Sequence, residues 1–487
     1  MDTASRTFPA NTNTIDPYIS AIELAAMVLR REVSPIELVE SCLARIEQLD
    51  PGLNAFCYRA DNDAKEAASA AVSLLAQASS DQELPPFLGV PLPIKDLVDV
   101  EGWPTTHGSA ATSRTPATSS DLVVKRFVDA GFILVGKSTT SEFGTVPFTE
   151  TDVLGITHNP WDTDRTAGGS SSGAGAAVAA GMVPIAHAGD GGGSIRIPAS
   201  CNGLVGLKPT RGRVASTTVE LEGLVTDGVL TRSVLDTAAA VDVLARHDPG
   251  SWWSPPTPTV TLSDALAVDP PTRLRVGVLT EVPVASIEVD PACKVAVEVT
   301  LRTLESAGCC LVDASLPLPS FDELASAFTT IWNVSGAGTT LTHPDRVQPH
   351  NRVLREMAHG TDSWNYADGV ARTQRLSRSI VEGFLARYDL VTPTMACLPP
   401  KIGAWKAGAD REPLMALLNS YPMAIFTTLF NVTGQPAISL PIHHDPATRL
   451  PVGVQLVAAP WGEDLLLQVS RILEEAHPWS SRRPPTC

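Results

Sequence analysis

Two serines set in glycine-rich loops are the residues of this chain whose types and spacing point to chemistry. Ser170 lies in the run Gly-Gly-Ser-Ser-Ser-Gly, and Ser194 ends the run Asp-Gly-Gly-Gly-Ser. Three glycines before a serine give the backbone torsions that other residues avoid, so consecutive N–H groups can converge on one oxygen atom. Such convergence forms an oxyanion hole, which stabilises the charge that develops during acyl transfer. We predict that this hole is formed by the N–H groups of Gly191, Gly192, Gly193 and Ser194.

A lysine that ends an apolar run is the third candidate. Lys95 closes the segment Gly-Val-Pro-Leu-Pro-Ile and is followed by Asp96. An ordinary lysine has a pKa of about 10.4 and is protonated at neutral pH, but burial disfavours the ammonium ion and lowers that pKa. A neutral Lys95 could then accept a proton from a serine nucleophile. A lone lysine is more often a solvated surface charge, and Asp96 suits a helix cap or a lysine partner better than a second base.

The loop around Ser170 has other interpretations. A flexible linker is disfavoured because an alanine-rich helical run follows at once. A phosphate-binding loop is disfavoured because the loop lacks the Gly-Lys-Ser/Thr element. A nucleophile elbow is disfavoured because Gly-x-Ser-x-Gly does not fit around Ser170 or Ser194, and the histidines show no triad order. We assign no histidine to catalysis. The remaining interpretation is a serine loop whose N–H groups and hydroxyls face a substrate.

Three residues are expected to support the two loops. Asp190 and Arg196 flank the second glycine run, six positions apart, and we predict that they pair and fix the turn. Ser171 is expected to hydrogen-bond within the first loop and to help orient Lys95.

Three segments together resemble the amidase signature family: GGSSSGAGAAVAAGMVP, GDGGGSIRIPAS and GLVGLKPTRGR. The resemblance covers residues 20–245 strongly and 274–480 more loosely. Lys95, Ser170 and Ser194 match the positions of that family's catalytic lysine, bridging serine and nucleophile. The resemblance implies a Ser–cis-Ser–Lys triad, a cis peptide bond before Ser170, an acyl-enzyme intermediate and C–N bond hydrolysis without a cofactor or metal. Two residues depart from the pattern: Ser172 replaces the usual glycine, and Gly191 the usual threonine.

The resemblance also narrows the substrate. It favours enzymes that hydrolyse hydrophobic linear or cyclic amides, aryl acylamides or carbamates (urethanes), with esters as further candidate substrates. The glutamine-hydrolysing A subunit of a tRNA-dependent amidotransferase is an alternative, but that subunit carries Gln where this chain has Ile197. A catalytically silent scaffold is another, disfavoured by the complete triad. Substrate contacts are expected from Gly144, Thr145 and Trp332, although ordinary core packing is at least as good an account of Trp332.

The elements that must position these residues follow from the pattern of apolar positions. Helical spacing over 19–49, broken at Ser34-Pro35, predicts two helices, and an alanine-rich helix is expected at 61–77. Short apolar runs then alternate with helical stretches, which predicts a layered α/β fold. Together with the resemblance, this implies a large, mixed, twisted sheet covered by helices on both faces.

We predict four segments along the chain. Residues 1–78 form a helical segment packed on the core, and residues 79–319 form the core with the Ser-Ser-Lys site. Residues 320–425 form a helical insertion that covers the substrate, and residues 426–487 complete the core with strands and a helix.

Composition limits the partners and the location. A formal net charge of −17 and the lack of a basic run argue against nucleic-acid binding. Eight scattered cysteines without zinc spacing indicate reduced thiols. We see no secretion signal or membrane-spanning run. We therefore expect a cytoplasmic monomer or homodimer that acts on a small-molecule amide or carbamate.

Overall fold

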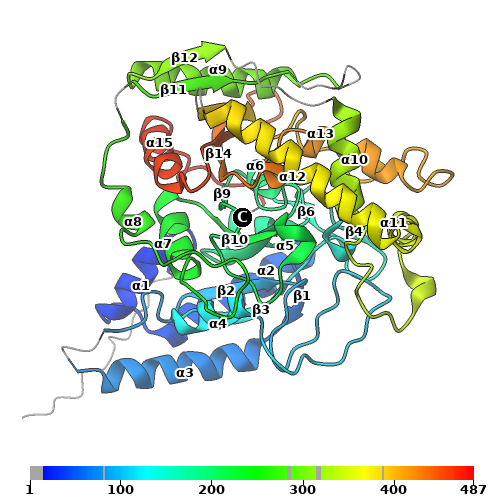
Figure 1. Ribbon diagram of the computed structural model, residues 1–487. Helices are drawn as coiled ribbons and strands as arrows, with labels where there is room; N and C mark the ends of the chain where they lie inside the picture. Colours follow the sequence, from blue (N-terminus) through cyan, green and yellow to red (C-terminus); the bar gives the residue numbers. More distant parts are fainter. Residues whose placement is uncertain are drawn as a thin grey trace, which may run out of the picture.

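The structure, a computed structural model, describes residues 15–79, 83–271, 273–281, 284, 287–313, 320–385 and 389–486. Within these residues the protein is built around one large mixed sheet and one small sheet, with helices packed on them (Figure 1). This arrangement confirms the predicted mixed α/β fold. Four short elements form two hairpins: β4 (Glu150–Thr151), β5 (Gly155–Ile156), β6 (His158–Asn159) and β7 (Asp162–Thr166).

The N-terminal helices begin where the sequence places their caps. Helix α1 (Ala21–Leu29) is followed by α2 (Pro35–Leu53). The Ser34 hydroxyl accepts the N–H of Glu37 at 3.1 Å, and the Glu37 carboxylate accepts the N–H of Ser34 at 2.8 Å, which is a capping box. Helix α3 (Asp61–Gln77) buries one face rich in alanine. The two helices predicted over 19–49 and the helix predicted at 61–77 are therefore confirmed.

The small sheet carries the candidate lysine at the end of an edge strand. Its order is β1 (Phe56–Arg59), β3 (Ile133–Ser138) and β2 (Pro91–Lys95). Strands β2 and β3 are parallel and are connected through α4 (Leu122–Asp129). All five residues of β2 are buried, because this edge strand of the small sheet lies against β8, the edge strand of the large sheet.

The large sheet has the strand order β12-β11-β13-β15-β14-β9-β10-β8. It is mixed, since β11 runs parallel to β12 and β13 while the remaining neighbours are antiparallel. Strand β8 ends the sheet next to β2, so the two sheet edges meet at the candidate site. The strands are β8 (Ala186–Asp190), β9 (Val205–Lys208), β10 (Thr226–Thr231), β11 (Arg275–Val278), β12 (Cys310–Asp313), β13 (Asp389–Pro393), β14 (Ala437–His444) and β15 (Pro451–Val457).

Helices cover both faces of the large sheet. Helix α6 (Arg196–Asn202) packs on β9, β14 and β15 beside α5 (Ser172–Ala179), where the Ser200 hydroxyl accepts the N–H of Gly453. The neighbouring Val452 and Val454 point the other way and join the apolar cluster of the opposite helices. These helices are α7 (Val234–Leu244), α8 (Leu262–Ala265), α9 (Pro291–Ser306) and α15 (Glu463–Ala476).

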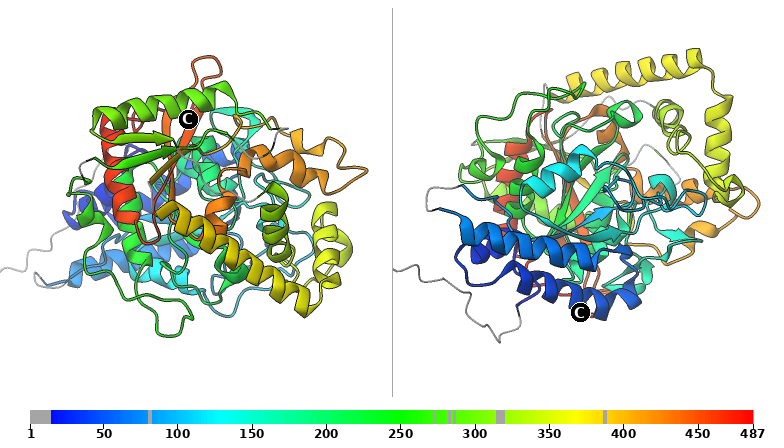
Figure 2. Two further views of the ribbon diagram at one scale, coloured as in Figure 1. Left: turned by 45° about the horizontal axis from the view of Figure 1, so that its top comes forward. Right: turned by 90° about the horizontal axis from the view of Figure 1, so that it is seen from below.

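Further helices gather on one side of the molecule, away from α1 and α3 (Figure 2). They are α10 (Phe321–Trp332), α11 (Pro349–Gly360), α12 (Ser363–Leu385), α13 (Met415–Ala424) and α14 (Thr428–Thr433). Strand β13 lies between α12 and α13 in sequence and pairs with β11 and β15 inside the large sheet. The range 320–425 is therefore not wholly an insertion, because it also supplies a core strand. The four-segment division otherwise stays a prediction.

Candidate active site

The end of β2 brings Lys95 against the first serine loop. Lys95 is 2% exposed and Ser170 is 1% exposed, and Lys95 Nζ lies 2.8 Å from Ser170 Oγ. Ser170 precedes α5, and its peptide bond to Gly169 is cis, as the family resemblance implied. Two residues 75 positions apart thus form one buried contact.

The Lys95 amine is held from a second side by the carbonyl of Gly189. Lys95 Nζ donates to this oxygen at 3.1 Å, and Ser171 Oγ donates to it at 3.4 Å. Ser171 therefore shares an acceptor with Lys95 instead of contacting the amine.

Burial lowers the pKa of Lys95 to about 8, because an ammonium ion loses its hydration there. The carboxylates of Asp190, Asp227 and Glu220 act in the opposite direction and raise that pKa. The balance leaves Lys95 much closer to neutrality than an exposed lysine.

Ser194 lies between β8 and α6, at the end of the glycine run. Lys95, Ser170 and Ser194 line one cavity of about 770 Å³. Gly193 has φ +132°, and a Cβ atom there would lie 2.3 Å from Thr427 Oγ1. Glycine is therefore required at this position both by the backbone torsion and by the close approach of Thr427.

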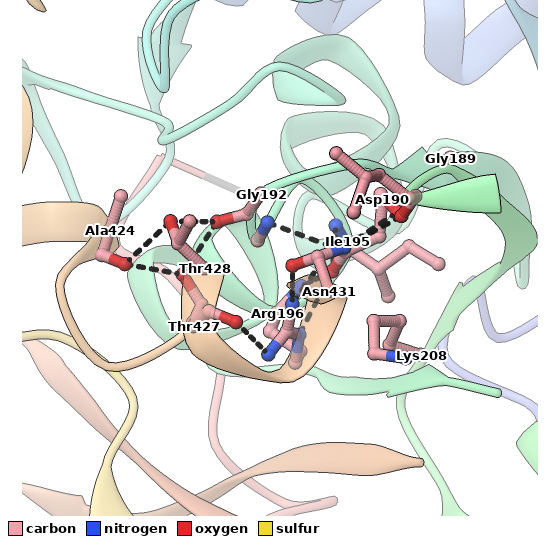
Figure 3. A network of polar contacts seen from close by, with 12 residues as sticks. Gly189, Asp190, Gly192, Ile195, Arg196, Lys208, Ala424, Thr427, Thr428 and Asn431 are labelled. Atoms are coloured by element: carbon pink, nitrogen blue, oxygen red, sulfur yellow. Dashed lines mark hydrogen bonds and ion pairs between the residues drawn. The ribbon is translucent and has the colours of Figure 1, made fainter. Parts of the chain in front are cut away.

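Asp190 and Arg196 form the predicted pair. Both side chains are fully buried, and the guanidinium donates from Nε and Nη2 to the two carboxylate oxygens, each at 2.9 Å (Figure 3). Asn431 also donates to Asp190, at 2.9 Å. Burial alone would raise the pKa of Asp190, but Arg196, Asn431 and Lys208 more than offset it and hold the pKa below its usual range.

The same carboxylate corrects one expectation for the oxyanion hole. The N–H of Gly193 donates to Asp190 Oδ1 at 2.8 Å, so it is not available to a substrate oxygen. In the described part of the chain, the amides of Gly191, Gly192 and Ser194 donate to no protein acceptor. The Gly192 carbonyl accepts the hydroxyls of Thr427 and Thr428 at 2.7 and 3.2 Å (Figure 3), which fixes the orientation of this peptide.

Two of the three expected substrate contacts line the cavity. Gly144 and Trp332 do so, and a Cβ atom on Gly144 would lie 3.4 Å from Ser170 Oγ. Thr145 does not line it, and its hydroxyl donates to Asn351 Oδ1 at 2.6 Å. The structure therefore does not bring Thr145 to the cavity, because a residue of α11 takes up its hydroxyl.

The cavity also contains residues to which the sequence analysis gave no role. His187 lines it, and its Nε2 lies 3.0 Å from Asp227 Oδ1. Four carboxylate side chains belong to the lining: Asp99, Asp121, Glu220 and Asp227. Burial raises the pKa of Glu220 to about 7, and the neighbouring carboxylates of Asp227 and Asp121 add smaller effects in the same direction. The alternation of β8 offered one signal, because His187 lies two residues before Gly189 and so shares a strand face with it.

Asp96 has a lysine partner other than Lys95. Its Oδ1 lies 3.6 Å from Lys137 Nζ, and both side chains are fully buried. Lys137 belongs to the run 131–138, which matches the Gly-x-x-x-x-Gly-Lys-Ser pattern of a phosphate-binding loop, but the structure places most of this run in β3. A buried strand presents no cradle of free N–H groups, so this match is not a nucleotide site.

Neither a metal-ligand cluster nor a membrane-spanning helix occurs among the described residues. These residues contain no group of three or more His, Cys, Asp or Glu side chains placed to hold a metal ion. None of the helices described there combines the length and apolar character needed to cross a membrane.

Comparison with known proteins gives consistent matches over nearly the whole chain. The Amidase family model matches residues 37–467. The 6-aminohexanoate-cyclic-dimer hydrolase of Paenarthrobacter ureafaciens is 35% identical over 495 residues, which cover 96% of this chain and 97% of that protein.

Solved structures agree with these sequence matches. A structure of 6-aminohexanoate cyclic dimer hydrolase complexed with substrate has a TM-score of 0.89 at 35% identity, covering 97% of this chain and 100% of the other. A bacterial aryl acylamidase of the amidase signature enzymes has a TM-score of 0.84 at 26% identity, covering 95% and 97%.

Proposed function

The chain belongs to the amidase signature family and is an amide hydrolase, and from this premise we propose that Lys95, Ser170 and Ser194 form its catalytic triad. The observation that carries the proposal is the 2.8 Å contact between Lys95 Nζ and Ser170 Oγ. Both residues are buried and line the same cavity as Ser194. A proton from the Ser194 hydroxyl can reach the buried amine only through a group that contacts that amine, and Ser170 is such a group.

The proposed reaction starts with a neutral Lys95. Ser194 Oγ attacks the amide carbon while its proton passes to Ser170 and the proton of Ser170 passes to Lys95. The negative charge on the carbonyl oxygen is stabilised by the N–H groups of Gly191, Gly192 and Ser194. Gly193 contributes only by holding the turn, because its N–H is bound to Asp190.

The second half of the reaction releases both products. As the C–N bond breaks, Ser170 returns a proton to the leaving amine, and the acyl group stays on Ser194. Water then gives up a proton through the same two groups and attacks the ester carbon. One amide and one water thus yield a carboxylic acid and an amine, and the triad returns to its initial state.

For the substrate, we propose a neutral and rather hydrophobic linear or cyclic amide, aryl acylamide or carbamate. Apolar side chains including Leu97, Phe143 and Trp332 line the cavity, and they favour an apolar substrate body. The lining carboxylates oppose anions, so malonamate is disfavoured. The relation to an enzyme that hydrolyses a cyclic amide dimer points the same way.

Activity assays and active-site labelling of the chain alone separate this proposal from two alternatives, the A subunit of a tRNA-dependent amidotransferase and a silent scaffold. The chain is expressed alone and supplied with amides, anilides, carbamates, esters and glutamine, with Ser194→Ala as the control. We expect turnover of anilides or hydrophobic amides without a partner chain, and loss of nearly all of it in Ser194→Ala. Faster turnover of glutamine or malonamate than of acetanilides would overturn the substrate proposal. Failure of a fluorophosphonate to label the folded chain would favour a silent scaffold.

A further inference from the structure

His187 is a buried titratable residue that the proposed mechanism does not use. It is fully buried on β8 and lines the cavity. Its Nδ1 lies 3.2 Å from the backbone nitrogen of Lys95, and its Nε2 lies 3.0 Å from Asp227 Oδ1 on β10. Phe127 of α4 packs edge-on against the ring, with centroids 5.8 Å apart. The imidazole therefore connects three elements at one point.

The two contacts fix the hydrogen on the ring. A backbone N–H can only donate, so Nδ1 must accept from Lys95 and carries no hydrogen. The neutral ring then carries its hydrogen on Nε2, where it donates to the carboxylate of Asp227. If Nδ1 carried a hydrogen, it would face the N–H of Lys95, and neither group could accept a hydrogen bond.

The contact between His187 and the backbone of Lys95 lies where the two sheets meet. Strand β2 is an edge of the small sheet and β8 is an edge of the large sheet. The two edges are in contact but are not paired in a ladder. The backbone N–H of Lys95 therefore finds its acceptor in a side chain of the neighbouring sheet. This bond joins the two sheets at the residue from which the candidate base extends.

We propose that His187 and Asp227 are positioning residues for Lys95: Asp227 holds the His187 ring as its Nε2–H form, and the ring fixes the end of β2. This inference rests on the proposed function, because it assigns Lys95 the role of proton acceptor.

Asp227 adds a charge to this hydrogen-bond chain. The charged or titratable groups that face Lys95 are Asp190 and His187 from β8, Asp227 from β10 and Glu220 from the turn Glu220–Gly223. All three carboxylates favour the ammonium form of Lys95. Asp227 alone among them also contacts His187, so its hydrogen bond and its charge can be separated by substitution.

Substitution of His187 tests the hydrogen bond. In His187→Asn the side-chain oxygen occupies nearly the place of Nδ1 and can accept the Lys95 N–H, whereas His187→Leu offers no acceptor. We expect kcat to fall about tenfold or more in His187→Leu with little change in KM, since small displacements of a catalytic group are costly. His187→Asn should regain most of that loss. Equal kcat values for the leucine variant and the wild type, or no recovery in a folded asparagine variant, would overturn the proposal.

If the leucine variant does not fold, the asparagine variant of His187 still tests the hydrogen bond, and substitution of Asp227 tests separately whether its charge acts on Lys95. Asp227→Asn keeps an oxygen for His187 Nε2–H but removes a negative charge near Lys95. The acidic limb of the pH profile of kcat/KM should therefore move to lower pH, by about half a pH unit. An unmoved or upward-shifted limb would contradict the proposed arrangement.

The failure of this inference can be told from the failure of the proposed function. Lys95→Met is measured in parallel with the His187 variants. If Lys95→Met retains activity, the triad itself is wrong. If Lys95→Met is inactive while His187→Leu is fully active, the triad stands and only the positioning role of His187 is lost.

Discussion

At the scale of single residues, the proposed chemistry depends on the amine of Lys95, whose pKa is shifted in opposite directions by burial and by nearby carboxylates. Burial disfavours the ammonium form of Lys95, while Asp190, Asp227 and Glu220 favour it. Burial is the larger effect, and the pKa is lowered to about 8. A base with a pKa near the working pH combines a sizeable neutral fraction with enough basicity to accept a proton.

The lowered pKa of Lys95 makes the unfolding free energy depend on pH, and Lys95→Met tests this dependence. Between the folded pKa of about 8 and the ordinary value of 10.5, the unfolded state binds more protons than the folded state. The stability contributed by Lys95 is therefore lowest below the folded pKa and rises with pH through this window. From about pH 7 to about pH 10, urea denaturation should show the unfolding free energy of the wild type rising by about 2 kcal/mol relative to Lys95→Met. A difference that is independent of pH would contradict a lowered pKa.

At the scale of elements, the second glycine loop is fixed by the ion pair that flanks it, Asp190 with Arg196. Asp190 closes β8 and Arg196 begins α6, so their pairing sets the distance between the strand and the helix. The same carboxylate accepts the N–H of Gly193 and that of Ile195, at 2.8 and 3.1 Å. The turn that presents Ser194 thus depends on Asp190.

Asp190→Asn should destabilise the protein strongly, because it leaves the Arg196 guanidinium buried without a counter-charge. Breaking a buried pair in this way costs about 3–5 kcal/mol. The control is Glu23→Gln, which breaks a surface pair with Arg30 whose side chains are 53% and 48% exposed, and which should cost less than about 1 kcal/mol. Unfolding in urea measures both variants. Similar small losses in the two would show that the buried pair does not hold the loop.

At the scale of the whole molecule, the sequence predicts those parts of the site that depend on local pattern. The lysine, the two serines and the Asp190–Arg196 pair follow from motifs within short segments. The role of Thr145 could not be predicted, because Asn351 lies 206 residues away and reaches it only in the folded chain. The contact between His187 and Lys95 likewise spans 92 residues and two sheets.

Two other differences between prediction and structure concern the N–H of Gly193 and the strand β13. The N–H of Gly193 is bound by a carboxylate only three residues earlier in the same turn. Strand β13 is a short, mixed segment (Asp-Leu-Val-Thr-Pro) between helical segments, and only its pairing with β11 and β15 shows that it belongs to the core. Periodicity predicts that an element exists, but its neighbours decide which layer it joins.

The cavity itself is a product of the whole molecule, since α10 brings Trp332 into its wall beside the second glycine loop. Trp332 is 9% exposed, stacks on Phe328 with centroids 4.9 Å apart, and would lie 3.0 Å from a Cβ atom on Gly191. In Trp332→Leu the loss of aromatic contact should raise KM for a neutral aryl amide about fivefold or more. We expect kcat to change by less than about threefold, because Trp332 takes no part in the proton path.

Trp364→Leu on α12 is the matched control, because this tryptophan is 79% exposed and lies outside the cavity lining. Its KM should equal that of the wild type. Steady-state kinetics on one aryl amide compare the two variants, with thermal unfolding as a check that both are folded. If the two substitutions change KM equally, the α10 wall does not contact the substrate. A rise confined to Trp332→Leu places the substrate body against the α10 wall of the cavity.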